Sequence, residues 1–359
     1  MPFGSEVTTI AFHLPQFHPT PENDQWWEPG FTEWTLTTRA KPLFRGHSQP
    51  RHPGRLGFYD LRLAEARDAQ GRLAAQYGVD AFCYWHYWFG DGVRFLAEVV
   101  DAVVETGYPS NGFCLGWANE DLTATWRGRP GSVLQKQRYP SGDDDLKHFD
   151  AVEAAFHSPR YLRVDGKPLF YIYRPIDHPD LAGFIERWRK RAESSGLGGV
   201  YFVAEATGDN LTRLSCDIDA VVVVDWTRAF RSGDRIRRPR RGPLRESYAR
   251  AATDFPGTAG PMGKTTFPCV LTGWDNTPRH GRAGVVLTGR TPTLFADQVR
   301  SALKLVPEPP LLFIKSWNEW SEGNYLEPDN EQDTRYLDAL ASAFRSPCHQ
   351  QVDEPLALP

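Results

Sequence analysis

The chain has 359 residues, of which 40% are hydrophobic, with a formal net charge of −4 and a pI near 6.2. That length is compatible with two domains or with one α/β barrel, and the slightly acidic charge gives no indication of nucleic-acid binding. The five cysteines are odd in number and widely spaced, so the sequence predicts no disulfide framework, no metal site and no cofactor; they are Cys83, Cys114, Cys216, Cys269 and Cys348.

The first residues, MPFGSE, lack the basic start and apolar core of a signal peptide. No apolar run reaches the length needed to cross a bilayer. We therefore predict a cytoplasmic protein without a membrane span. The sequence makes no prediction of the oligomeric state.

Short buried runs alternate with helical patterns along the whole chain. The predicted strands are 7–14, 79–84, 112–116, 168–173, 200–204, 220–224, 267–271 and 311–314. The predicted helices are 61–77, 93–106, 143–156, 181–195, 293–305 and 335–344. The first of these helices has apolar residues at helical spacing, and Gly78 provides its stop.

This alternation predicts the α/β fold class, as a single (β/α)8 TIM barrel with long βα loops. Nearly every run is followed by aromatic or polar residues, as the catalytic end of a barrel requires. An open sheet would gather such residues at one switch point, and no G-x-G-x-x-G follows the first strand. We predict one domain over residues 1–345 and a loose tail over 346–359.

The stretch after the eighth strand carries the strongest chemical signal. Trp317, Asn318, Glu319, Trp320, Ser321 and Glu322 follow one another directly, and Gly323 provides a hinge. Two carboxylates three residues apart can face one side of a turn. Such a pair beside aromatic rings suits glycosidic chemistry, in which one group transfers a proton and the other activates a nucleophile. The structural alternative is an acidic helix N-terminus.

Aromatic residues make up 13% of the chain, including 12 Trp and 13 Tyr, and a carbohydrate cleft would use them. Other candidates for substrate binding follow the remaining strands or lie in the first long loop. They are His13, Trp34, His86, Trp117, Asn119, Glu120, Tyr173, Trp274 and Asn276. For each the alternative is a packed side chain with satisfied hydrogen bonds. The arginine-rich segment 228–245 is either a solvated loop or a rim that contacts an anionic partner.

Seven phrases in order make the chain recognisable: HLPQFH at 13–18, ENDQWW at 22–27, GFTEW at 30–34, FCYWHYWF at 82–89, WANE at 117–120, GWDNTP at 273–278 and WNEWSEGNYLEP at 317–328. From about Thr8 to Leu340 the chain resembles the WbsX-type proteins, which carry a glycoside hydrolase family 99-like domain related to endo-α-mannosidases. Genes for such proteins are often found in bacterial polysaccharide loci for O-antigen or capsule.

The resemblance implies a retaining glycoside hydrolase, endo-acting on an α-linked, mannoside-like bacterial polysaccharide. Glu319 and Glu322 match the two glutamates of the family motif, while Ser321 stands where that motif has histidine. By analogy, Glu319 would be an ionised base on the sugar 2-hydroxyl, giving a 1,2-anhydro sugar. Glu322, with a raised pKa, would be the general acid and then the base.

Two other functions stay open at this point. One is a glycosyltransferase or transglycosylase in polysaccharide biosynthesis, because some similar proteins are described as transferases. The other is a non-catalytic glycan-binding barrel. All three functions predict an oligo- or polysaccharide as the partner. They stay open because motifs shared with a hydrolase do not fix the reaction.

Overall fold

The computed structural model describes residues 7–124, 132–207, 213–214, 217–224, 226–230, 242–256, 260 and 263–345. The predicted tail and most of the arginine-rich segment, residues 231–241, lie outside these ranges. In the described part, no helix is both long and apolar enough to cross a bilayer.

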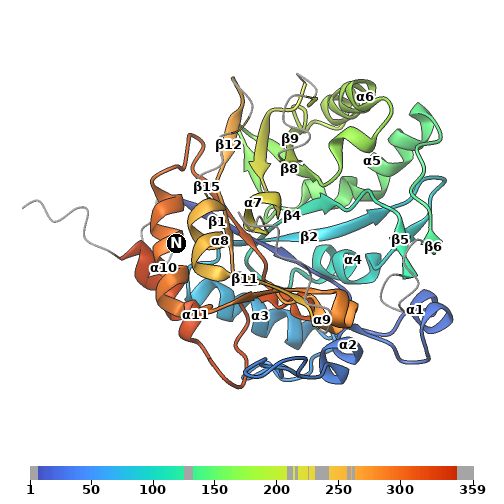
Figure 1. Cartoon of the computed structure of the whole chain (residues 1–359). Helices are drawn as coiled ribbons and strands as arrows, with labels where there is room; N and C mark the ends of the chain where they lie inside the picture. The colour runs from blue at the N-terminus through green and yellow to red at the C-terminus, as the bar shows by residue number, and fades with distance from the viewer. Residues whose placement is uncertain are drawn as a thin grey trace, which may run out of the picture.

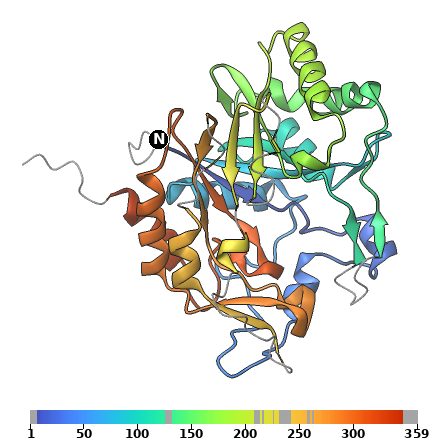
Figure 2. The ribbon, with the colours of Figure 1, turned by 45° about the horizontal axis from the view of Figure 1, so that its top comes forward.

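Along its main path the central sheet is parallel, in the order β12-β10-β9-β8-β4-β2-β1-β15-β13. Most connections are crossovers between neighbouring strands, as in a βα barrel (Figures 1 and 2). The strands are β1 (Thr8–His13), β2 (Ala81–Trp88), β4 (Gly112–Trp117), β8 (Lys167–Ile172), β9 (Tyr201–Ala206), β10 (Ala220–Val223), β12 (Thr265–Phe267), β13 (Cys269–Leu271) and β15 (Leu311–Lys315).

The seventh position of the barrel is shared by two short strands. β12 pairs with β10, β13 pairs with β15, and only Pro268 separates β12 from β13. Proline has no N–H to donate to a β-ladder, so it interrupts this strand and leaves two short ones. The Pro268 carbonyl still accepts from Phe313 N at 3.0 Å. The predicted barrel of eight strands is therefore confirmed.

The predicted helices are present, with ends displaced by a few residues, and pack outside the strands. They are α3 (Ala64–Gln76), α4 (Ala97–Thr106), α5 (Gly142–His157), α6 (Leu181–Ser194), α10 (Pro292–Leu303) and α11 (Arg335–Phe344). Gly78 has a φ of +86°, as expected of a glycine that ends a helix. The sequence prediction did not include α8 (Tyr248–Asp254).

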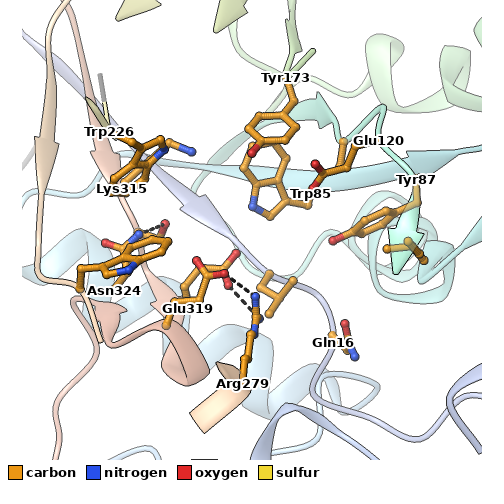
Figure 3. Close-up of a pocket in the computed structure, with 16 residues that line it drawn as sticks. Gln16, Trp85, Tyr87, Glu120, Tyr173, Trp226, Arg279, Lys315, Glu319 and Asn324 are labelled. Atoms are coloured by element: carbon orange, nitrogen blue, oxygen red, sulfur yellow. Dashed lines mark hydrogen bonds and ion pairs between the residues drawn. The ribbon is translucent and has the colours of Figure 1, made fainter. Parts of the chain in front are cut away.

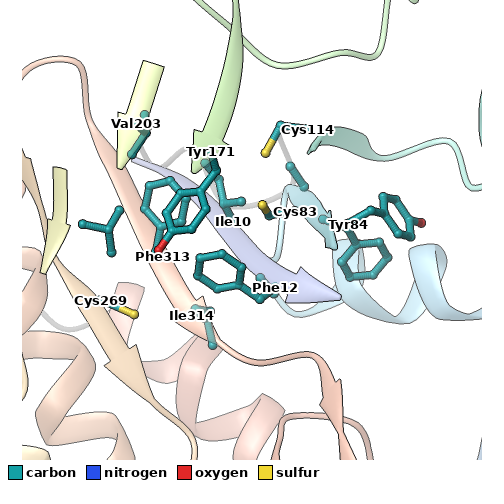
Figure 4. Close-up of a cluster of buried hydrophobic side chains, with 14 of the residues drawn as sticks. Ile10, Phe12, Cys83, Tyr84, Cys114, Tyr171, Val203, Cys269, Phe313 and Ile314 are labelled. Carbon is teal, nitrogen blue, oxygen red and sulfur yellow. The ribbon is translucent and has the colours of Figure 1, made fainter. Parts of the chain in front are cut away.

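Large side chains fill the middle of the barrel, so it is a packed core rather than a pore. Phe12, Tyr171 and Phe313 come from three different strands, and the Phe12 ring centroid lies 5.0 Å from that of Tyr171 and 5.8 Å from that of Phe313. Figure 4 shows these rings together with Ile10 and Cys83. As predicted, Cys83 and Cys114 are buried free thiols.

The long βα loops lie at the C-terminal end of the strands and have their own short elements. The first loop contains α1 (Pro21–Trp26) and α2 (Glu33–Arg39). The loop after β13 contains α9 (Thr277–His280) and β14 (Val285–Thr288), which pairs with β11 (Leu244–Ser247). The loop after β15 forms the hairpin β16 (Asn318–Glu319) and β17 (Asn324–Tyr325) around the 3-10 turn η4 (Trp320–Glu322). These loops place polar side chains over one end of the barrel.

Candidate active site

A cavity opens at the C-terminal end of the strands, with about 830 Å³ of empty space including its mouth. The position of this cavity is the one at which barrel enzymes place their active sites. Figure 3 shows Glu319 between aromatic and charged side chains. The lining residues are Leu14, Gln16, Trp85, Tyr87, Ala118, Glu120, Leu122, Tyr173, Trp226, Trp274, Arg279, Lys315, Ser316, Glu319, Glu322 and Asn324.

Both glutamates of the predicted pair line this cavity and contact the same arginine. Arg279 Nη2 lies 3.4 Å from Glu319 Oε2, and Arg279 Nη1 donates to Glu322 Oε1. A third carboxylate, from Glu33 in α2, accepts from Arg279 Nη2 at 3.0 Å. Glu33 is fully buried and also accepts from Ser321 N at 3.0 Å. One guanidinium from the seventh loop therefore connects three carboxylates, one from the first loop and two from the eighth.

The charge state of Glu319 differs from the prediction of an ionised carboxylate. Burial and the neighbouring Glu322 raise the pKa of Glu319 to about 8, although Arg279 acts to lower it. The physical reason is that one arginine cannot compensate three carboxylates in a site with little water. The raised pKa therefore favours the protonated form of Glu319 in the free protein.

This raised pKa predicts how Glu319→Gln changes stability with pH. The pKa of about 8 in the folded protein lies above the ordinary value of 4.5, so the fold binds this proton more tightly than the unfolded chain does. The resulting stability is fully present below pH 4.5 and is lost as the pH rises through 8. Glutamine cannot ionise, so the stability of Glu319→Gln relative to the wild type should rise between pH 4.5 and pH 8 and level off above that. Urea unfolding at several pH values measures this difference, and a constant difference would contradict the assignment.

The hairpin that carries the glutamates is fixed from below by a buried carboxylate. Glu327 accepts from Trp320 Nε1 at 2.6 Å, from Tyr59 OH at 2.9 Å and from Gln70 Nε2 at 2.7 Å. Burial raises the pKa of Glu327 to about 7, although these donors act to lower it. Trp320 also stacks on Tyr325, with ring centroids 3.9 Å apart. The turn between the glutamates is therefore rigidly supported.

Gly323 allows a close approach between the seventh and eighth loops. Its φ is +58°, and a Cβ at this position would lie 2.7 Å from Asp275 Cβ. Asp275 N donates to the carbonyl of Glu322. The Asp275 carboxylate accepts from His47 Nε2 at 2.8 Å and from Gln49 Nε2 at 2.7 Å. Burial would raise the pKa of Asp275, but His47 and other donors lower it to about 2, so it stays charged.

The floor of the cavity contains a second ion pair. Lys315, at the end of β15, has its Nζ 3.2 Å from Glu205 Oε2, which also accepts from Tyr171 OH at 2.7 Å. Burial acts to lower the pKa of Lys315, but Glu205 outweighs it and the pKa is raised. The ammonium lies 5.2 Å from the Trp85 ring centroid and 5.6 Å from that of Tyr173. A cation is therefore held under the aromatic walls.

Three of the predicted substrate-binding residues line the cavity: Glu120, Tyr173 and Trp274. Glu120 Oε2 accepts from Arg174 Nη2 at 3.0 Å, and burial raises its pKa against the effect of Arg174. The ring centroid of Trp274 lies 4.4 Å from that of Trp226, so the two indoles form one aromatic wall.

Four predicted residues on the early strands face away from the cavity. His13 Nε2 contacts Gln70 Oε1 at 3.1 Å, and burial lowers the pKa of His13 to about 3. His86 Nε2 contacts His148 Nε2 at 2.9 Å, outside the barrel. Trp117 Nε1 donates to the Trp88 carbonyl at 2.9 Å, and the Asn119 amide bridges the backbone of Arg174. Their contacts are those of structural residues, which corrects the prediction of substrate binding.

The remaining predicted residues support the loops instead of lining the cavity. Trp34 Nε1 donates to the Tyr59 carbonyl at 2.9 Å, and Asn276 Oδ1 accepts from Val285 N at 2.7 Å. Trp317 and Trp320 are buried in the core. Asn318 Oδ1 accepts from Leu14 N at 2.7 Å, and its Nδ2 donates to Leu14 O at 3.0 Å. In a sequence, such amides resemble sugar ligands, because hydrogen bonds from a side chain to the backbone leave no recognisable sequence pattern.

The structural role of Asn318 gives a second prediction. Replacing it by Ala leaves the Leu14 N–H and C=O buried without their partner, which should cost about 2–4 kcal/mol of unfolding free energy. The effect on KM for a substrate should be less than about threefold, as for a residue that does not touch it. Denaturant unfolding and steady-state kinetics separate the two. A large rise in KM with unchanged stability would instead restore the binding role.

Sequence reasoning missed Arg279 and Lys315, and the cavity also contains Gln16, Trp85 and Asn324. Arg279 directly follows the quoted GWDNTP phrase, so its position was the available signal. Lys315 gave no such signal, because in the sequence it is only the residue that ends an apolar strand. In the described ranges no three His, Cys, Asp or Glu residues are grouped so that they could hold a metal ion.

Comparison with known proteins extends these findings. The sequence model of the family described as Glycosyltransferase WbsX matches residues 9–340. The uncharacterized protein WxcX of Xanthomonas campestris pv. campestris is 35% identical over 355 residues, covering 96% of this chain and 50% of that protein. The chain thus spans about half the length of the curated relatives that it matches.

Two solved structures share the fold at low sequence identity. A glycoside hydrolase-like protein has a TM-score of 0.64 and 14% identity, with 95% of each chain covered. The GH99 endo-alpha-mannosidase from Bacteroides thetaiotaomicron has a TM-score of 0.56 and 17% identity, with 95% of this chain and 98% of that chain covered. The barrel architecture of this chain is therefore that of glycoside hydrolase family 99.

Proposed function

The chain belongs to the Glycosyltransferase WbsX family, and from that premise we propose that it cleaves glycosidic bonds in an α-linked, mannoside-like bacterial polysaccharide. The observation that carries the proposal is the placement of Glu319 and Glu322 in one cavity with aromatic rings. Paired carboxylates of this kind perform the proton transfers of glycoside cleavage.

The first step uses the two glutamates in different roles. Glu319, as the carboxylate, takes the proton of the sugar 2-hydroxyl while that oxygen attacks the anomeric carbon. Glu322, as the acid, gives its proton to the leaving oxygen as the glycosidic bond breaks. The product of this step is a 1,2-anhydro sugar, and no covalent bond to the protein forms.

The second step reverses the proton transfers. A water molecule gives a proton to Glu322 as its oxygen attacks the anomeric carbon. The bond from that carbon to the ring-closing oxygen breaks, and the oxygen takes back its proton from Glu319. Two inversions at one carbon give net retention. Since only the ionised form of Glu319 starts the reaction, its pKa of about 8 places the rising limb of the pH–rate profile near that pH.

The aromatic walls support action within a chain rather than at its end. Figure 3 shows Trp226 on one side of Glu319 and Tyr87 on the other. Both rings line the cavity, so a sugar residue can stack on each side of the bond that is cleaved. This arrangement favours endo cleavage.

The test is a screen of the purified protein against surface polysaccharides from the bacterium that encodes it and against α-mannans. Mass spectrometry of released fragments, run in H2¹⁸O, should show oligosaccharides with one ¹⁸O at the new reducing end. Glu319→Gln and Glu322→Gln should each release fragments at least about 10²-fold more slowly than the wild type. Release by both variants at the wild-type rate would reject the mechanism.

A second candidate, a glycosyltransferase or transglycosylase in polysaccharide assembly, is favoured by the description of the family. It predicts a longer glycan formed from a donor and an acceptor, instead of ¹⁸O-labelled fragments. The same mass spectra distinguish the two reactions. A barrel that only binds glycans would give neither product, and both Gln variants would still bind.

A further inference from the structure

A second cavity lies beside the seventh and eighth loops and shares no lining residue with the first. It has about 710 Å³ of empty space, its mouth included. Residues from three segments line it: 44–51 in the first long loop, 286–290 in β14 and the turn before α10, and 329–336, which ends in the first turn of α11. The proposed reaction makes no use of this cavity.

Two arginines line this second cavity and face the same aromatic ring. The Cζ atom of Arg51 lies 5.7 Å from the ring centroid of Tyr325, and that of Arg290 lies 5.4 Å from it. Arg290 Cζ also lies 4.1 Å from the Tyr336 ring centroid. Two positive charges are therefore held in one small region, with Asp275 and Asp329 as the nearby negative groups.

The two guanidinium groups use few of their donors on protein acceptors. Arg51 Nε is 3.4 Å from Ser48 O, and Arg290 Nη1 is 3.2 Å from Thr272 O. Each guanidinium has one carboxylate at ion-pair distance: Arg51 Nη2 is 3.8 Å from Asp275 Oδ2, and Arg290 Nη2 is 4.0 Å from Asp329 Oδ2. Both distances are longer than a hydrogen bond. Within the described ranges, the buried Arg51 Nη1 has no hydrogen-bond partner.

The two acidic residues of this cavity are already engaged. Asp329 accepts from Tyr325 OH at 2.7 Å and from two backbone amides, Glu331 N at 3.0 Å and Gln332 N at 2.6 Å. Glu331 is exposed, and both its oxygens lie 2.7 Å from Ser48 Oγ. Of the described arginine donors here, Arg51 Nη1 thus remains open to a ligand that brings acceptor oxygens.

The place of the cavity in the fold indicates which kind of anion it would bind. In βα barrels a phosphate site is frequently built from the loops after the seventh and eighth strands and a helix N-terminus. Here those two loops supply most of the lining, and α10 and α11 begin beside it. Arginine forks match phosphate oxygens in pairs. We propose that the second cavity binds a phosphate group through Arg51 and Arg290.

The test measures binding of three probes to the full chain by calorimetry: inorganic phosphate, a sugar 1-phosphate and GDP. Saturable binding of any of them is expected and supports the site. Tighter binding of a phosphate ester than of inorganic phosphate assigns the site to a phosphorylated ligand, while equal binding assigns it to the free ion. If none of the three binds, the proposal is overturned.

Variants locate the binding. Arg290→Gln should weaken it most, but Arg290 also supports Tyr336 and the variant can fail to fold. Gln332→Glu is nearly isosteric, leaves both arginines intact and adds a negative charge at the cavity wall. It should raise the Kd for phosphate about tenfold. Gln76→Glu makes the same change on an exposed residue outside the cavity and should leave the Kd unchanged. Equal Kd values for Gln332→Glu and the wild type would place the anion elsewhere and refute the proposal.

Discussion

Replacing Glu322 by Gln should lower kcat by about 10²–10⁴-fold on a natural glycoside, because the leaving oxygen would lose its proton donor. A substrate with an activated aryl leaving group needs little protonation. On such a substrate the loss should therefore be much smaller. The ratio of the two losses, measured from steady-state rates, identifies Glu322 as the general acid.

The same two substrates applied to Glu319→Gln test the opposite assignment. A buried carboxyl group with a pKa of about 8 has the character of a general acid as well as that of a strong base. If Glu319 is the base, its variant should lose activity on both substrates alike. If activity on the activated substrate survives in Glu319→Gln and not in Glu322→Gln, the roles are exchanged. Glu308→Gln, on an exposed residue, is the matched control and should change neither rate.

The sequence sufficed for the barrel because its information is local. Most runs buried on both faces are followed by a helix with an apolar stripe, and this alternation permits few architectures. The elements that it missed, such as α9 and the β11–β14 pair, are short and lie in loops. Their stability comes from tertiary contacts such as the Asn276 side chain on Val285 N, which leave no periodic signal.

The site was predicted only in part for a similar reason. Glu319 and Glu322 stand out in the sequence because placing two carboxylates beside indole rings costs free energy, so the pair indicates a functional role. In the sequence, His13, Trp117 and Asn318 cannot be distinguished from residues that line the cavity, but their side chains point away from it. Successive residues of a strand face opposite sides, so a shift of one residue decides the direction. Arg279 is the opposite case, because its importance arises from Glu33, which is 246 residues away in the chain.

Replacing Arg279 by Met should have the second large effect, on both catalysis and stability. Glu33, Glu319 and Glu322 would lose their shared cation while remaining close together. Breaking a buried ion pair in this way costs about 3–5 kcal/mol. The cost should be largest near pH 8 and should shrink toward pH 5, because the carboxylates can then take up protons. Urea unfolding at both pH values measures it.

The catalytic effect of Arg279→Met follows from the charge of Glu319. Arg279 acts to lower the pKa of Glu319, so its removal should move the rising limb of the pH–rate profile above pH 8. At pH 7, kcat/KM should fall by about 10²-fold, since less of the base is ionised and both glutamates lose their common anchor.

Arg279→Lys keeps the positive charge but lacks the forked guanidinium group. It should return the rising limb of the pH–rate profile to its wild-type position and restore only part of kcat/KM. Arg72→Met, on a side chain that is 77% exposed, is the matched control for the loss of an arginine. If Arg279 were only a structural anchor, Arg279→Met would lose stability and rate while the limb stayed near pH 8. A limb that moves therefore shows that one guanidinium sets the proton affinity of the base, and that the first loop, through Glu33, takes part in the chemistry of the eighth.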